Sequence, residues 1–105
     1  MVKIAYKLFR VRKDGSIGPL FINRPQRIPL GKPLAAEAHR TPGYAYRPGW
    51  HVCSRPVAPH LSKKGRRWYA VEIKEWTEHR RPANQGGMWF TANSMTVLRP
   101  IGAVG

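Results

Sequence analysis

The segment RWYAVEIKEW, Arg67–Trp76, carries the clearest strand pattern in the chain and decides its fold class. Tyr69, Val71 and Ile73 share one face, and the residues between them share the other. This period of two is typical of a half-buried β-strand, and the aromatic and β-branched residues favour the same structure. We therefore expect a sheet to organise the domain.

The segment VKIAYKLFRVR near the N-terminus alternates in the same way, with Ile4, Tyr6 and Leu8 on one apolar face. We expect this face to be the buried one. The dipeptide Asp14-Gly15 favours a tight hairpin turn, because both positions can adopt positive φ angles. The returning strand is then predicted at PLFIN, Pro19–Asn23, which starts with a proline as edge strands often do.

Further strands are predicted for GWHVCS, residues 49–54, and for MWFTANSMTVLRPI, residues 88–101, with a bend near Asn93. The segment PLAAEAH, residues 33–39, is the predicted helix, because Pro33 suits the first helical position and leucine and alanines follow it. With 105 residues, the chain is long enough for one core. We predict one domain over residues 1–105, of the α+β class: a β-rich, mostly antiparallel twisted sheet with one short helix and long proline-containing loops.

Charge is the strongest compositional signal. Nineteen Lys and Arg residues face five acidic residues, which gives a net charge of +14 and a pI near 11.2. Nucleic acid is the usual partner of such a surface. No apolar run is long enough to cross a bilayer and no amphipathic basic helix is evident, so no membrane partner is expected. The lone Cys53 cannot form an internal disulfide, which fits a reducing cytoplasm.

Two loops combine cations with groups that contact nucleic acids. In SKKGRRWYA, Ser62–Ala70, cations can neutralise phosphates, the glycine allows close approach, and an aromatic ring can stack on a base. In HRRPANQGG, His79–Gly87, arginines are followed by amides that can reach base edges. The predicted nucleic-acid contacts are Lys63, Lys64, Arg66, Arg67, Trp68, Arg80 and Arg81.

Metal binding and thiol chemistry are alternatives at one strand. His51 and Cys53 are two residues apart and point the same way, and His39 or His60 could join them. The spacing matches no known zinc framework, so no metal is expected. Cys53 beside a histidine could form a thiolate–imidazole pair, but a lone cysteine is more often a packing residue.

The motifs RPGWHVC, APHL, RWYAVEI and QGGMW resemble those of a family of small uncharacterised proteins encoded by bacteriophages and prophages. The similarity runs from YKLFRVRKDGSIGPLFINR to the final MTVL and so covers nearly the whole chain. The resemblance implies an accessory role in phage biology and a location in the host cytoplasm.

A second resemblance is to ADP-ribosyltransferase-like domains, through KLFRV, GWHVCSRPVAPHL and RWYAVEI. It implies a split sheet and an NAD site, in which Arg10 would hold a phosphate or ribose and His51 would stack on nicotinamide. The candidate catalytic residues are then Arg10, His51 and Gln85. Such enzymes usually carry a glutamate before the last strands, whereas NQGGMWFTANSM has no acidic residue and offers only Gln85.

These observations favour binding over catalysis. The predicted function is that of a small basic phage accessory protein that binds nucleic acid, or a nucleic-acid-bound host complex, without a cofactor. One alternative is an ADP-ribosyltransferase-like domain, active or degenerate, that binds NAD or ADP-ribose. The other is an inhibitor that docks on an acidic host protein. The sequence leaves the oligomeric state open.

Overall fold

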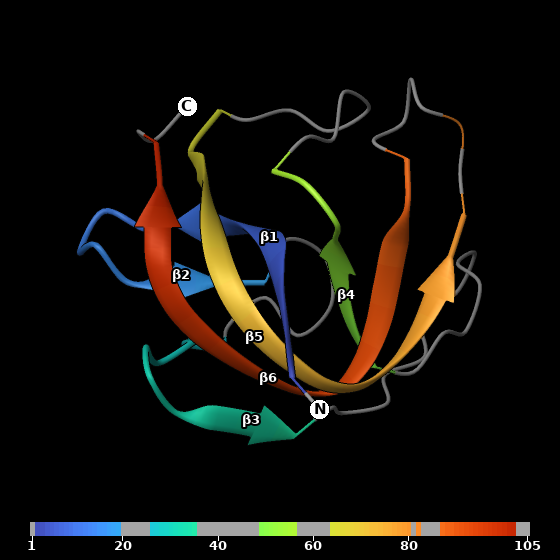
Figure 1. The fold of residues 1–105 in the computed structure, drawn as a ribbon. Helices are drawn as coiled ribbons and strands as arrows, with labels where there is room; N and C mark the ends of the chain where they lie inside the picture. The colour runs from blue at the N-terminus through green and yellow to red at the C-terminus, as the bar shows by residue number, and fades with distance from the viewer. Residues whose placement is uncertain are drawn as a thin grey trace, which may run out of the picture.

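Six strands form one sheet in the computed structural model of this chain (Figure 1). The structure describes residues 2–19, 26–35, 49–56, 64–80, 82 and 87–102. The strands are β1 (Lys3–Val11), β2 (Ile17–Gly18), β3 (Pro33–Ala35), β4 (Trp50–Cys53), β5 (Arg66–His79) and β6 (Trp89–Ile101). These described residues contain no helix.

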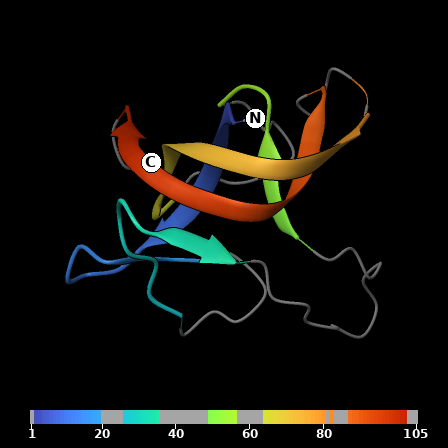
Figure 2. The same ribbon diagram turned by 60° about the horizontal axis from the view of Figure 1, so that its bottom comes forward.

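The sheet closes on itself. Strand β5 pairs with β1 on one side and with β6 on the other, and β4 pairs with both β6 and β1. All four pairings are antiparallel, so β1, β4, β6 and β5 form a complete circuit, which is a small barrel. Figure 2 shows β1 and β4 crossing the long hairpin of β5 and β6, with β3 outside along β6.

The hairpin of β5 and β6 can contribute to both sides of the barrel because both strands bend (Figure 1). Glu75 has a φ angle of 52°, in the left-handed region. Ile73 and Trp76 both pack toward the core, although two residues lie between them instead of one. The alternation of inward and outward side chains therefore shifts at this point. The alternation of β6 shifts in the same way between Ala92 and Met95, where the sequence predicted a bend.

The core fills the barrel, and the residues that share one face of β5 in the sequence lie in it together. Tyr69, Val71 and Ile73 are at most 7% exposed and belong to the main cluster. The Tyr69 ring meets Phe9 edge-on, with ring centroids 5.7 Å apart. The largest side chains that are fully buried are Phe9, Phe90, Ile73, Met95, Val52, Val71 and Val97.

The face predicted for β1 was wrong. Ala5 and Phe9 point into the main core, whereas Ile4 is 47% exposed. Lys3 lies on the same side as Ala5 and Phe9, and its ammonium group lies 5.3 Å from the centre of the Phe90 ring. A lysine can occupy an inward position at the end of a barrel because its long stem carries the charge out to water.

The predicted α+β class was also wrong, because the expected helix begins as a strand. Pro33–Ala35 is β3, which pairs with Ser94–Thr96 of β6. The Leu34 carbonyl accepts a hydrogen bond of 3.0 Å from the Trp50 indole nitrogen. A two-turn helix has little intrinsic stability, so pairing with a neighbouring strand outweighs its propensity. The rest of the predicted helix lies outside the described residues.

The split sheet implied by the ADP-ribosyltransferase resemblance was wrong as well. The described strands close into a barrel through the pairing of Tyr6 in β1 with Cys53 in β4. In β4, Val52 is 1% exposed while His51 is exposed. Alternation follows from strand geometry alone and therefore does not distinguish between two sheet topologies.

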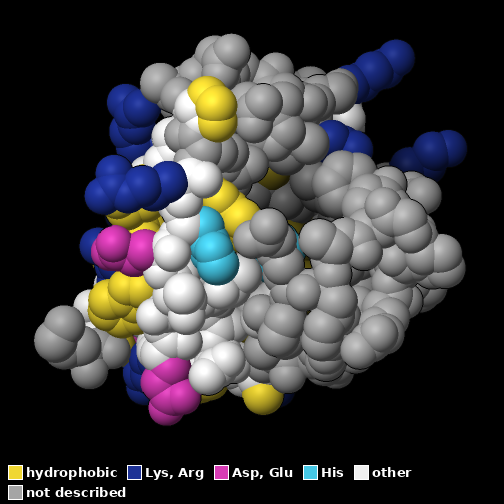
Figure 3. Space-filling view, turned by 90° about the vertical axis from the view of Figure 1, so that its right-hand side faces the viewer, with side chains coloured by type: hydrophobic (Ala, Val, Ile, Leu, Met, Phe, Trp, Pro, Cys, Tyr) yellow, Lys and Arg dark blue, Asp and Glu magenta, His cyan; other side chains and the backbone are white. Residues whose placement is uncertain are grey.

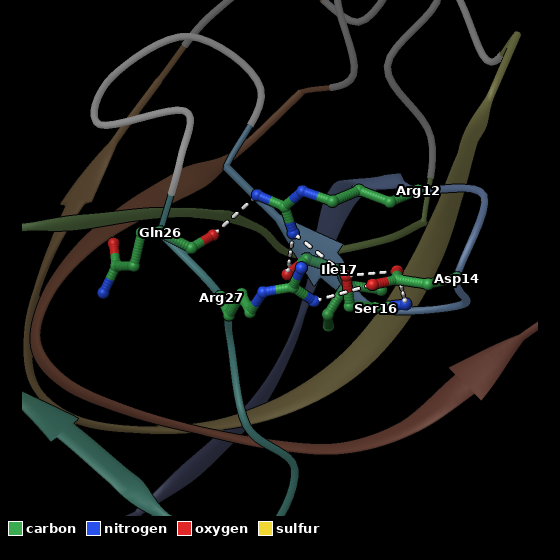
Figure 4. A network of polar contacts seen from close by, with 6 residues as sticks. All are labelled: Arg12, Asp14, Ser16, Ile17, Gln26 and Arg27. Atoms are coloured by element: carbon green, nitrogen blue, oxygen red, sulfur yellow. Dashed lines mark hydrogen bonds and ion pairs between the residues drawn. The ribbon is translucent and has the colours of Figure 1, made fainter.

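The hairpin between β1 and β2 is present, but it forms differently from the prediction. Gly15 has a positive φ angle of 87°, as predicted. Asp14 contributes instead through its carboxylate, which accepts hydrogen bonds from the backbone and hydroxyl of Ser16. Arg27 forms an ion pair of 2.9 Å with the same carboxylate (Figure 4). Strand β2 is Ile17–Gly18, which precedes the predicted returning strand, and residues 20–25 lie outside the described part.

Arg12 connects this hairpin to the next segment. Its guanidinium donates hydrogen bonds of 2.9 Å to the carbonyls of Ile17 and Gln26 (Figure 4). A Cβ atom on Gly18 would overlap this guanidinium, so Gly18 leaves the space that Arg12 occupies. Arg12 therefore stabilises the fold.

Candidate nucleic-acid interface

Four cations surround the point where β1 ends and β5 begins. Arg10 of β1 lies directly opposite Arg66 of β5, and Phe9 lies opposite Arg67. The backbone nitrogen of Val11 donates a hydrogen bond of 2.9 Å to the Gly65 carbonyl, which holds the Lys64–Gly65 turn beside β1. We call Arg10, Lys64, Arg66 and Arg67 the basic corner.

The four side chains of the basic corner differ in direction and exposure. Arg10 and Arg66 are half-buried and share the outer face of the barrel, because paired residues point the same way. Lys64 is exposed. Arg67 belongs to the inner face, like its partner Phe9, and its Nε atom is buried without a hydrogen-bond partner. An unpartnered buried donor costs about 1–3 kcal/mol.

The basic corner places like charges close together. Like charges placed directly across two strands destabilise a sheet, and Arg10 and Arg66 are such a pair. The acidic residues of β5 come later along the strand, at Glu72, Glu75 and Glu78. Both arginines of β5 therefore lie at the end that β1 borders, whereas its three glutamates lie further along the strand.

Trp68 lies behind the basic corner. It is 6% exposed and packs with Leu8 in a second apolar cluster on the outer face, against which Tyr6, Cys53 and Ile101 also pack. Its indole nitrogen is buried without a hydrogen-bond partner. The ring predicted to stack on a base thus has no open face in this arrangement. Beyond this cluster, Arg99 is exposed and lies opposite Ala70.

The structure separates the two predicted basic loops. Arg80 is exposed and directly follows β5, at the opposite end of the strand from the basic corner. Lys63, Arg81 and Gln85 lie outside the described residues. Of the residues considered for metal binding, His39 and His60 also lie outside the described part.

The two described catalytic candidates occupy different strands of the barrel. Arg10 has neighbours on β2 and β5, where it joins the basic corner, whereas His51 on β4 lies opposite Thr91 of β6. The sequence suggested Arg10 as a residue that holds NAD. The structure places it beside residues that were predicted to contact nucleic acid.

A cluster of three rings on the outer face was not predicted from the sequence. Trp89 stacks on His79, with centroids 4.4 Å apart and planes 27° apart. His51 approaches the same indole at 5.2 Å with its plane tilted by 47°. We call these three residues the ring row. Figure 3 shows histidine in the middle of one face, beside hydrophobic atoms, with both basic and acidic side chains toward the margin.

The signal for the ring row was present in the sequence but weak. In MWFTA, Phe90 and Ala92 alternate with Trp89 and Thr91, so one aromatic residue must face outward if the other is buried. Phe90 is 1% exposed and Trp89 is half-buried. The two histidines come from other strands, and only the register of β4, β6 and β5 places them beside the indole.

Lys7 lies at the seam between β1 and β4. Its ammonium group donates a hydrogen bond of 2.7 Å to the His51 carbonyl. Burial lowers the pKa of Lys7 from 10.5 to about 8, and the negative charge of Cys53 opposes this shift. The strands are joined there by one residue pair, Tyr6 with Cys53, so Lys7 adds a donor where the ladder is short.

Within the described part of the chain, no helix is long and apolar enough to span a membrane. Comparison with known proteins found no matching family model, no matching curated protein and no matching solved structure.

Proposed function

We propose that the protein binds nucleic acid through the basic corner. The observation that carries this proposal is the direct pairing of Arg10 with Arg66, beside Lys64 and Arg67. Cations gathered on one part of a surface favour the binding of an anionic ligand. A phosphate backbone is such a ligand, because it brings closely spaced negative charges to a surface of closely spaced cations.

The net charge supports the same proposal. With +14 on 105 residues, the folded chain repels itself, and a polyanion relieves this repulsion when it binds. The expected partner is nucleic acid, alone or within a nucleoprotein complex. A role in phage biology inside a host cell stays a prediction from sequence resemblance.

The test is the salt dependence of binding. Fluorescence anisotropy of a labelled DNA duplex should show an affinity that falls linearly with the logarithm of salt concentration. In the double variant Arg10→Ala/Arg66→Ala, we expect the magnitude of this slope to fall by about 1.8, which corresponds to two phosphate contacts. The matched control Lys32→Ala/Lys74→Ala removes the same charge from two exposed sites elsewhere and should change the slope by less.

Three outcomes would contradict the proposal. The first is a wild-type protein that binds neither DNA nor RNA at low salt. The second is an equal effect of both double variants, which would mean that net charge and not the basic corner determines binding. The third is equal competition by polyglutamate, which would favour an acidic protein as the partner.

A further inference from the structure

The ring row lies where three strand ends meet. Cys53 at the end of β4 pairs with Trp89 at the start of β6, and Trp89 pairs with His79 at the end of β5. Val52 and Phe90, the neighbours of this row in sequence, point into the core. The rings of Trp89, His79 and His51 therefore lie on the outer surface of the barrel.

The contacts of the ring row hold it in position. The Nε2 atom of His79 lies 2.9 Å from the Thr91 hydroxyl, which orients the imidazole against the indole. The ammonium group of Lys7 donates a hydrogen bond to the backbone carbonyl of His51, which fixes the β4 backbone beneath the His51 ring. His51 is exposed, and Trp89 and His79 are half-buried, so His51 is the most accessible of the three rings.

Two exposed arginines border the ring row. Arg80 directly follows His79, and Arg55 follows β4 by two residues. The Arg55 guanidinium lies beside Gly87, two residues before Trp89, since a Cβ atom there would be 4.0 Å from one of its nitrogens. Cations thus follow the strands on both sides of the indole, at positions where they can meet phosphates.

We propose that the ring row is a stacking site for an unpaired nucleobase, and that it makes the protein prefer single-stranded nucleic acid to duplex. This inference depends on the proposed binding of nucleic acid. In a duplex, each base is already stacked between its neighbours, so rings on a flat sheet surface can reach only unpaired bases. Arg55 and Arg80 hold the phosphates on either side of the stacked base.

The experiment compares three labelled probes by fluorescence anisotropy: a short oligothymidylate, an abasic strand of equal length and a duplex. The wild-type protein should bind oligothymidylate more tightly than the abasic strand. Trp89→Leu keeps an apolar residue on the sheet but removes the π face. We expect it to weaken oligothymidylate binding by about 5- to 150-fold, the range for one stacked base. Binding of the abasic strand and the duplex should stay unchanged, and Trp89→Phe should retain most of the affinity.

A second variant keeps the test valid if Trp89→Leu does not fold. His51→Ala removes an exposed ring and should weaken oligothymidylate binding by a smaller factor, again without an effect on the abasic strand. Thermal unfolding of each variant shows whether the fold is intact.

The outcomes separate this inference from the proposal on which it depends. If the wild-type protein binds none of the three probes, the proposed function fails and this inference fails with it. If it binds the abasic strand as tightly as oligothymidylate, or if folded Trp89→Leu loses affinity for all three probes equally, only the stacking site is overturned.

Discussion

The basic corner holds four cations around the start of β5, whereas the ring row holds three rings around the end of β5 and the strands beside it. At the basic corner the nearest indole, Trp68, is buried. At the ring row the indole is half-buried beside an exposed histidine, and the cations belong to the segments that follow the strands. The sequence placed cations and an aromatic ring together in the loop Ser62–Ala70. In the structure, the clustered cations and the clustered rings lie in different regions.

This separation has a physical consequence. Binding at the basic corner should be electrostatic, strongly dependent on salt and indifferent to base pairing. Binding at the ring row should depend on unpaired bases and less on salt, because stacking releases few counterions. The two regions can therefore be distinguished by variants that change one property at a time.

The largest effect is expected from Arg66→Glu. One lost phosphate contact weakens binding about tenfold at 0.1 M salt, and repulsion by the new carboxylate should bring the loss to about a hundredfold. The same change places opposite charges across β1 and β5, and should stabilise the fold by about 0.2–1 kcal/mol. Anisotropy titration and urea unfolding measure the two quantities.

The control for Arg66→Glu is Lys74→Glu, which changes the net charge equally at an exposed position further along β5. It should weaken binding much less and leave the fold no more stable. A loss of stability in Arg66→Glu would show that Arg66 supports the fold, and the contrast between the two regions would then fail.

The next largest effect is expected from Gly49→Ala, which should disturb the ring row. Gly49, just before β4, has a φ angle of 111°, and a Cβ atom there would lie 3.1 Å from the Ala92 carbonyl oxygen. Gly49→Ala should therefore cost about 1–3 kcal/mol of stability and displace β4 from β6. In anisotropy titrations, the variant should lose its preference for single strands while its affinity for duplex persists.

The control is Gly65→Asn, at the turn of the basic corner. Gly65 has a φ angle of 69°, which asparagine tolerates, and there is open space around its Cβ position. We expect this variant to change stability and strand preference little. An equal loss in the two glycine variants would contradict the steric argument for Gly49.

Some strands of the fold could be predicted from their local sequence pattern, whereas others depend on pairing with distant strands. The pattern of β5 predicted correctly which residues share a face, and Tyr69, Val71 and Ile73 enter the core together. Strand β1 has apolar residues on both faces, and only closure of the barrel decides that Phe9 is inside while Ile4 is outside. The helix predicted at residues 33–39 failed because its first residues pair with a strand far along the chain.

The candidate site shows the same division. The basic corner was largely predictable, because Lys64, Arg66 and Arg67 are consecutive or nearly so, although the addition of Arg10 required the register of β1 and β5. The ring row was not predictable as a unit, because His51 and Trp89 are distant in sequence and meet only through strand pairing.

A smaller effect is expected at the seam that joins the two regions. Because the pKa of Lys7 is about 8 in the folded protein and 10.5 otherwise, the unfolded chain binds more protons between these values. The free energy of unfolding should therefore rise between pH 8 and pH 10.5. In Lys7→Met, urea unfolding over this range should show a smaller rise than in the wild-type protein.

Cys53→Ser sharpens this prediction. The charge of Cys53 raises the pKa of Lys7, so its removal should extend the rise to lower pH. If Lys7→Met followed the wild-type curve, the ammonium group would be hydrated in the folded protein and burial would not lower its pKa.

The smallest effect is expected at the hairpin that follows β1. Hydrogen bonds from Ser16 and the ion pair with Arg27 hold the pKa of Asp14 well below its ordinary value of 3.8. The carboxylate therefore stabilises the fold above that value, and its contribution is lost as the pH falls below it. Asp14→Asn should lower stability slightly at neutral pH and not at strongly acidic pH, as measured by urea unfolding.

Salt separates the two contributions of Asp14. Both partners of the ion pair are more than half exposed, with side-chain exposures of 65% and 53%, so the attraction should be screened by added salt. The hydrogen bonds from Ser16 lie within the turn and should persist. The neutral-pH difference between wild type and Asp14→Asn should therefore shrink in high salt, and an unchanged difference would mean that Arg27 contributes nothing. Neither result should alter the proposed binding at the basic corner, because Asp14 acts on the turn and not on Arg10, Lys64, Arg66 or Arg67.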